Sequence, residues 1–174
     1  MGDTLIAVVA IALSAVLMFV FPVLTMSDRV DTALNTDIQA MTSDLVNEIR
    51  NTGKLTNDVY SRYIERIGST GNTYDVNLEF KILDENPGKK TIQVEKDKIG
   101  ENLYYSVFTS QIEDTISVNG VYKLKEGDIV MVTVRNKNMT LAQYLKNFLY
   151  SSVGSDIYKI EASESGMVTA TATR

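Results

Sequence analysis

An uninterrupted apolar segment near the start of the chain constrains this protein more than any other feature. From Leu5 to Leu24 the sequence runs for 20 residues without a charged side chain. A helix of that length rises about 30 Å, which matches the hydrocarbon thickness of a bilayer. A buried core helix of this length and purity would be unusual. The segment also lacks a basic start and a small-x-small cleavage pattern, so we expect a retained membrane anchor rather than a removed signal peptide.

The helix is not expected to end with the apolar segment. Beyond it, apolar residues recur every three or four positions among charged and polar ones, which predicts an amphipathic continuation. These residues are Met26, Val30, Leu34, Ile38, Met41, Leu45 and Ile49. Since Gly53 supplies a C-terminal stop, we expect one helix from about Asp3 to Thr52, about 75 Å long. We expect the strand from Tyr74 to Ile82 to cover the apolar stripe of its second half.

Pro22 lies within this otherwise regular helix. Proline has no amide hydrogen, and its ring crowds the preceding turn. We therefore expect a kink or a local opening at Pro22. In lipid, the carbonyl groups freed in this way would take partners from neighbouring helices.

The remainder of the chain is long enough for one domain with its own core. Alternating apolar and polar residues predict a strand from Tyr74 to Ile82 with one buried face and one wet face. Further strands are expected at Ile92 and Val94, in a hairpin from Val121 to Val134, and from Tyr158 to Ala162.

Helices are expected between these strands. Thr56 can cap a helix that ends at Gly68, and Thr140 with Gln143 forms a capping box for a helix that closes at Gly154. Between Asn102 and Val118 the apolar spacing favours a helix, although residues 104–108 could equally form a strand.

These elements predict an α+β fold: a long N-terminal helix, half apolar and half amphipathic, that carries a small antiparallel β-rich head with two or three further helices. We expect residues 1–25 to form a transmembrane or filament-core helix and residues 26–53 its amphipathic continuation. Residues 54–174 are expected to form the globular α+β head.

The composition excludes many kinds of chemistry. The chain contains no histidine and no cysteine, which rules out Ser-His-Asp and Cys-His catalysis, thiolate zinc sites, haem ligation by histidine and disulfides. Its net charge of −5 argues against a nucleic-acid partner, because an acidic domain repels phosphate backbones. Asp84, Glu85, Asp97 and Glu101 match no calcium loop and are interpreted as a solvated acidic rim. We therefore expect no catalytic residue, no metal site and no cofactor.

Two smaller features have ordinary explanations. Tyr104, Tyr105 and Tyr144 are interpreted as core or rim aromatic residues rather than as a ligand site. Asn138 begins an Asn-Met-Thr glycosylation sequon, but three-residue sequons are common by chance.

Asp3 precedes the apolar segment, where a carboxylate is costly unless it stays at the membrane interface or finds a cation. One interpretation is that Asp3 marks the interface and favours the helix start electrostatically. The other is that it pairs with the Met1 amine of an adjacent subunit.

The combination of an uncharged N-terminal helix, an early acidic residue, Pro22, an amphipathic continuation and a strand-rich head resembles a type IV pilin. It is also similar to the pilin-like subunits of tight-adherence and type II secretion systems. That resemblance implies that the apolar half-helices sit in the membrane before assembly and bundle as the filament core afterwards. It implies that the early acidic residue, here Asp3, neutralises a neighbour's terminal amine, and that Pro22 accompanies local unwinding.

The head resembles small surface proteins of clostridial gene clusters that encode pilus-type ATPases. The resemblance lies in residues 49–54 (IRNTGK), 70–76 (TGNTYDV), 83–90 (LDENPGKK) and 125–130 (KEGDIV).

We therefore expect a non-enzymatic structural subunit of an extracellular pilus-like filament or pseudopilus on a bacterial surface, anchored in the membrane before assembly. Its expected partners are identical subunits in a helical homopolymer and a pilus-type assembly machinery. One alternative is a singly anchored accessory protein of a secretion or conjugation machine with a protein-binding head, and another is an anchored carboxylate-dependent hydrolase. The residues expected to act in assembly are Asp3, Leu5, Val9, Ala12, Val16 and Pro22.

Overall fold

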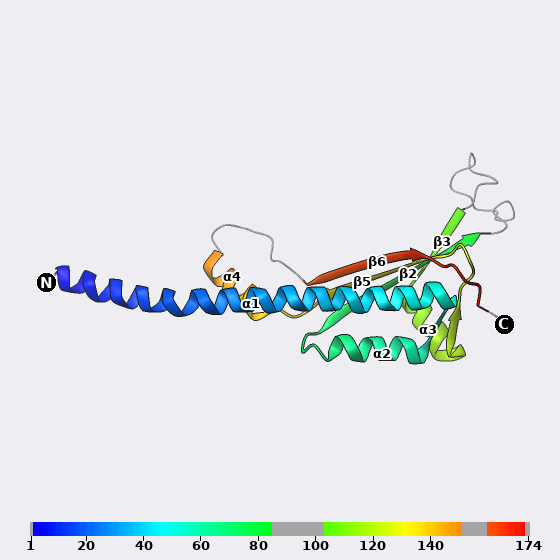
Figure 1. Cartoon of the computed structure of the whole chain (residues 1–174), viewed down its shortest axis with the longest axis horizontal. Coiled ribbons are helices and arrows are strands. Elements are labelled where there is room, and N and C mark those ends of the chain that lie inside the picture. Colours follow the sequence, from blue (N-terminus) through cyan, green and yellow to red (C-terminus); the bar gives the residue numbers. More distant parts are fainter. Residues whose placement is uncertain (1, 85–102, 151–159, 173–174) are drawn as a thin grey trace.

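The computed structural model describes residues 2–84, 103–150 and 160–172. Within these residues the chain forms four helices and six strands (Figure 1). In chain order they are α1 (Gly2–Thr52), β1 (Lys54–Thr56), α2 (Asn57–Gly68), β2 (Tyr74–Asp84), β3 (Leu103–Phe108), α3 (Thr109–Asn119), β4 (Val121–Lys123), β5 (Ile129–Asn136), α4 (Leu141–Tyr150) and β6 (Glu161–Met167). The predicted α+β class, with a long N-terminal helix and a small β-rich head, is confirmed.

Helix α1 is a single element of 51 residues that projects far beyond the head (Figure 1). Its bounds confirm the expected helix from about Asp3 to Thr52. The helix continues through Pro22 to Thr52, so Pro22 does not interrupt it in the single chain. The kink expected at Pro22 stays a prediction. One missing amide donor does not disrupt a helix whose neighbouring turns stay bonded. Unwinding at Pro22 in an assembled state stays a prediction.

The head is built on a four-stranded antiparallel sheet with strand order β3-β2-β5-β6. Strand β5 alternates between buried and less buried residues along its length, because successive side chains of a strand point to opposite faces of the sheet. Val130, Val132 and Val134 of β5 are fully buried beside Leu78 and Phe80 of β2. The strand predicted from Tyr74 to Ile82 is therefore confirmed as β2.

The second half of α1 closes this core. Ile38, Leu45, Val46 and Ile49 are each at most 3 % exposed, and they pack in one cluster with the buried residues of the sheet. Strand β6 lies along α1 in Figure 1, and side-chain hydrogen bonds join the two from Asn35 to Arg50. Burial of these aliphatic side chains stabilises the union of helix and sheet by about 1.5–3 kcal/mol each.

The cover of the apolar stripe differs from the expected one. Strands β6 and β5 lie nearest to α1, whereas β2 lies one strand further away. The strand order explains the difference, because β6 and β5 lie at the end of the sheet beside α1, and β5 separates β2 from β6. The stripe is also only partly covered, since Met26 is 71 % and Val30 50 % exposed.

The stretch that begins at Asn102 contains a strand followed by a helix, so the helix expected over its whole length was wrong for residues 103–108. These residues pair with β2 from Glu79 to Asp84 and extend the sheet. The helix begins only at Thr109, whose hydroxyl accepts a hydrogen bond of 2.8 Å from the backbone nitrogen of Leu78. Sheet pairing therefore decides between two patterns that the local sequence left open.

The hairpin expected from Val121 to Val134 was wrong. Strand β4 pairs with β1 in a separate two-stranded sheet, while β5 joins the main sheet. The turn between them is held by Asp128, which accepts hydrogen bonds from the backbone nitrogens of Lys125 (2.8 Å) and Leu83 (2.9 Å). Because this buried carboxylate binds the turn to β2, strands β4 and β5 separate instead of pairing with each other.

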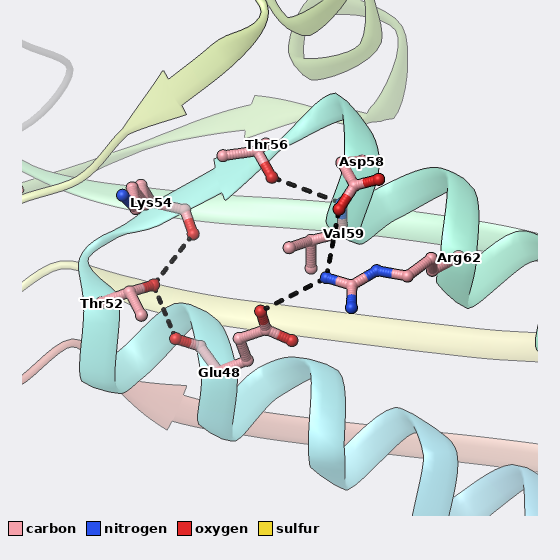
Figure 2. Close-up of polar contacts among 7 residues, drawn as sticks. All are labelled: Glu48, Thr52, Lys54, Thr56, Asp58, Val59 and Arg62. Carbon is pink, nitrogen blue, oxygen red and sulfur yellow. Dashed lines mark hydrogen bonds and ion pairs between the residues drawn. The ribbon is translucent and has the colours of Figure 1, made fainter.

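The connection from α1 to α2 is short and closely hydrogen-bonded (Figure 2). The backbone nitrogen of Gly53 donates to the carbonyl of Ile49 (2.8 Å) at a φ of +66°, the left-handed end of a helix that Gly53 was expected to supply. The Thr52 hydroxyl donates to the carbonyls of Glu48 (2.7 Å) and Lys54 (3.2 Å). The chain therefore turns into β1 without a loose linker.

Helix α2 begins as the sequence predicted. The Thr56 side chain accepts a hydrogen bond from the backbone nitrogen of Val59 (3.3 Å), which satisfies one of the free donors at the helix start (Figure 2). Arg62 pairs with Asp58 on its own helix (3.4 Å) and with Glu48 on α1 (3.9 Å). Both pairs are exposed and contribute little, about 1 kcal/mol or less each.

The capping box of α4 is confirmed. The Gln143 backbone nitrogen donates to the Thr140 hydroxyl (3.3 Å), and the Thr140 nitrogen donates to the Gln143 side chain (3.2 Å). The close of that helix at Gly154 and the strands expected at Ile92 and Val94 and from Tyr158 lie outside the described residues, apart from the last residues of the final strand. Ile160 and Ala162 are both buried there, and β6 begins at Glu161.

We predict that Gly53→Ala destabilises the head far more than Gly71→Ala. Both glycines have positive φ values, +66° and +83°, where a side chain costs about 1–2 kcal/mol. A Cβ atom at Gly53 would also collide with the backbone oxygen of Ala170, whereas a Cβ atom at Gly71 meets nothing within 4 Å. Urea unfolding of the full chain in detergent micelles, followed by circular dichroism, measures both losses. Equal losses would contradict the close approach at Gly53.

Candidate functional site

The first half of α1 is the most exposed apolar surface of the described chain. Every residue from Gly2 to Phe19 is exposed. The most apolar window of 18 residues has a mean hydropathy of 2.8, and none of it is buried. The helix is therefore long and apolar enough to cross a membrane, which is compatible with an anchor or with a signal sequence.

The structure places four of the predicted assembly residues on one face of α1. Leu5, Val9, Ala12 and Val16 follow one another at spacings of four, three and four, which at 3.6 residues per turn keeps them within about 60° of each other. All four are exposed. Asp3 is exposed on nearly the opposite side of the helix. Asp3 therefore does not share the face of Leu5, Val9, Ala12 and Val16. The Met1 amine, which in one of the two interpretations of Asp3 pairs with it from an adjacent subunit, lies outside the described residues.

Pro22 is exposed, about six residues beyond Val16. It lies where α1 changes its surroundings. Val20, Leu24 and Ser27, at helical spacing, are only partly exposed, whereas the residues before Val20 are exposed on all sides. The predicted proline position is thus the boundary between the free half of α1 and the part that the head begins to cover.

The element that covers this boundary is α4, and sequence reasoning gave it no role there. Lys146 of α4 forms an ion pair of 2.6 Å with Asp28 of α1, and the Thr140 hydroxyl donates a hydrogen bond of 2.5 Å to Asp31. Asp28 and Asp31 lie three residues apart on one helix face, where two carboxylates repel each other unless another group partners them. Nothing in the sequence connects Asp31 to a residue 109 positions away.

An apolar groove runs along this contact. It has a volume of about 490 Å³, and its walls include Val23, Met26 and Val30 of α1 and Met139 and Leu141 near the start of α4. Its lining carries no cluster of titratable groups that could perform chemistry, only Asp31, which already accepts the Thr140 hydrogen bond. The groove can hold an apolar chain or side chains.

The rim carboxylates and tyrosines that the structure describes do not come together in a catalytic or metal-binding site. Of the four rim carboxylates, Asp84 is described at the end of β2, while Glu85, Asp97 and Glu101 lie outside the described residues. Among the residues that the structure describes, no group of three or more acidic side chains is placed to hold a metal ion. Tyr104, Tyr105 and Tyr144 are 40 %, 46 % and 68 % exposed, so they are rim rather than core residues.

The side chain of Asn138, which begins the sequon, is hydrogen-bonded at both ends of its amide group. Its side-chain oxygen accepts a hydrogen bond of 2.7 Å from the backbone nitrogen of Thr73, and its side-chain nitrogen donates one of 2.8 Å to Asn72. The side chain thus ties the start of β2 to the loop that precedes α4.

Comparisons with protein-family models, with curated proteins and with solved structures find no match to this chain. The exposed helix therefore has to be interpreted from its own chemistry.

Three tyrosines of the head have raised pKa values. Burial raises the pKa of Tyr60, and its hydrogen bond of 2.7 Å to Glu113 raises it further. Burial also raises the pKa of Tyr63, although its hydrogen bond of 2.9 Å with Thr42 acts in the opposite direction. Burial is again the main cause at Tyr122, which packs edge-on against Phe80. All three lie in the head, outside the apolar half of α1.

We predict that the head loses stability above pH about 10, the ordinary pKa of tyrosine. Above that pH the unfolded chain releases tyrosine protons while Tyr60, Tyr63 and Tyr122 keep theirs in the folded state, so the free energy of unfolding falls as pH rises. Urea midpoints of the full chain in micelles from neutral to alkaline pH test this. Tyr60→Phe should make the alkaline fall less steep, and an identical fall in both proteins would contradict the assignment.

Proposed function

We propose that this chain is a structural subunit of an extracellular pilus-like filament or pseudopilus on a bacterial surface. In this proposal it is held in the membrane by its N-terminal helix before a pilus-type machinery assembles it. The observation that carries the proposal is the continuity of α1, which is apolar and exposed on every side in its first half and forms part of the head core in its second half. The resemblance to type IV pilins in the sequence points the same way.

The all-round apolar surface favours a polymer over a docked helix. A helix with one apolar stripe can be covered by a single partner, but the segment from Leu5 to Leu24 is apolar on every side. Outside lipid, only several neighbours at once can cover such a rod. At about 25 cal/mol per Å² of apolar surface, leaving the segment uncovered in water would cost far more than a single charge pair contributes, so neighbouring subunits have to replace the lipid that covered it.

The rigid attachment of α1 to the head also favours a load-bearing subunit. The backbone nitrogen and hydroxyl of Thr169 both donate to the carbonyl of Arg50 (3.0 and 3.2 Å), and the Arg50 side chain donates to Met167 (2.9 Å). These bonds fasten the C-terminal end of the helix to the strand at the head's edge. A tethered enzyme tolerates a loose linker between anchor and domain, whereas a filament subunit has to transmit force through that junction.

Electron microscopy of sheared surface material from cells that make this chain tests the proposal. We expect filaments that bind an antibody raised against the head. Detection of the protein only as detergent-soluble monomers would contradict the proposal and support a singly anchored accessory protein of a secretion or conjugation machine.

We predict that Val16→Lys abolishes filaments while Asp3→Asn only slows their assembly. A lysine at the centre of an apolar bundle costs about 3 kcal/mol or more in every subunit, whereas an exposed terminal charge pair contributes about 1 kcal/mol or less. Ala12→Glu should behave like Val16→Lys. Filament yield is scored by microscopy, after cell fractionation confirms that each variant still reaches the membrane. Complete loss of filaments with Asp3→Asn would make the terminal charge contact obligatory.

We predict that Pro22→Ala still assembles but gives a stiffer fibre. If subunits bundle, helical hydrogen bonding between Phe19 and Pro22 should be lost locally, since Pro22 donates no hydrogen bond of its own. Persistence lengths of wild-type and Pro22→Ala filaments, measured from micrographs, check this. Equal stiffness together with a fully bonded helix in an assembled structure would refute it.

A further inference from the structure

A second apolar surface lies on the head where the head meets the free half of α1. Met139, Leu141 and Tyr144 are 52 %, 61 % and 68 % exposed, and they follow one another within six positions at the start of α4. We call these three residues the α4 patch. Water-exposed apolar groups that gather in this way mark an interaction surface more often than isolated ones do.

The direction of α4 places this patch beside the apolar segment. Thr140 contacts Asp31, and Lys146, six residues later, contacts Asp28, so α4 runs back along α1 toward its N-terminal end. Figure 1 shows α4 alongside α1 on the side of the head that faces the free half of the helix. The partly covered Val20 and Leu24 lie further along the same line.

The depth of the patch follows from the rise of α1. Asp28 is four residues beyond Leu24, the last residue of the apolar segment, which corresponds to about 6 Å along the helix. The headgroup layer on each side of a bilayer is about 5–8 Å thick. If the apolar segment spans the hydrocarbon, Tyr144, which lies between Thr140 and Lys146, is therefore at headgroup depth.

The chemistry of the patch fits that layer. A tyrosine ring has an apolar body and a polar hydroxyl, and tyrosines gather at membrane interfaces for that reason. The acidic groups that would oppose contact with lipid are partnered, Asp28 by Lys146 and Asp31 by Thr140. Exposed Arg29 lies at the same level and adds a positive charge, which favours anionic headgroups.

We infer that the α4 patch contacts the bilayer: in the membrane-embedded subunit, Tyr144 inserts into the headgroup region while Leu141 and Met139 lie at its outer edge, and this contact sets the depth and tilt of the head. The inference rests on the membrane-anchored stage of the proposed function but not on filament formation. The membrane is favoured over a second copy as the occupant, because Met139 and Leu141 line one apolar groove with Val23 of the apolar segment, which lipid surrounds at that stage.

Single tryptophans can test this directly, because the natural sequence contains none. The full chain is reconstituted in phosphatidylcholine vesicles that contain lipid brominated either near the headgroup or deep in the acyl chain, and bromine quenches a tryptophan that it touches. Tyr144→Trp reports on the patch, and Leu141→Trp serves as a second reporter in case one variant displaces α4. Leu13→Trp marks the centre of the apolar segment. Val118→Trp, at an 81 % exposed site near the end of α3, marks the far end of the head.

We expect Tyr144→Trp to lose more of its emission to shallow bromine than to deep bromine, as for a side chain held in the headgroup layer. Leu13→Trp should show the reverse order, and Val118→Trp should be unaffected by either lipid. If Leu13→Trp is not quenched, the membrane-anchored stage itself fails. If Leu13→Trp is quenched while both patch reporters behave like Val118→Trp, only the inference about the α4 patch is overturned.

A second copy of the chain would give a different result. The patch reporters would then be blue-shifted without quenching, and the shift would disappear on dilution to about one chain per vesicle. That outcome would also overturn the inference, because it assigns the patch to another subunit.

Discussion

The structure depends on one constraint, that a single helix has to satisfy two environments. Between Ile38 and Ile49, α1 contributes fully buried aliphatic side chains to the head core, and between Gly2 and Phe19 it contributes none. The head cannot rotate or detach without exposing that core. Its orientation is therefore fixed relative to the apolar segment, so any membrane or neighbouring subunit that holds the segment also positions the head.

Close contacts at the C-terminal end of α1 fix the helix to the head. Gly53 lets the chain leave the helix in a left-handed turn so close to Ala170 that no side chain fits, and Gly166 leaves room for the Arg50 side chain to lie across β6. A substitution at either glycine would push apart segments that lie more than 100 residues apart in sequence. Tension on the N-terminal segment would reach the sheet through these contacts and through the buried helix face. A flexible tether would absorb the same tension.

Local patterns in the sequence were sufficient for most elements and insufficient for their pairing. Residues close together in the sequence determine the periodicity of α1, the caps at Thr56 and Thr140 and the alternation of β2. The structure contains α1, both caps and β2 as predicted. The separation of β4 from β5 depends instead on Asp128 binding the backbone of Leu83, and β3 depends on a free edge of β2. The contact of α4 with α1 likewise joins residues far apart in the chain. A single sequence carries no signal for such contacts, because many other distant pairs have the same chemistry.

Asp28 and Asp31, the two aspartates just beyond the apolar segment, explain why α4 is held against α1 at the end of that segment. If the apolar segment spans a membrane, these carboxylates lie close to the bilayer, where they are costly unless they are paired or hydrogen-bonded. An ion pair such as Asp28 with Lys146 contributes little in water, about 1 kcal/mol or less, but its contribution rises as the surrounding dielectric falls. The contacts that hold α4 against α1 should therefore be stronger beside a membrane than in solution. If lipid contacts the α4 patch as we infer, it would also strengthen the polar contacts behind the patch, so that insertion and attachment of α4 favour each other.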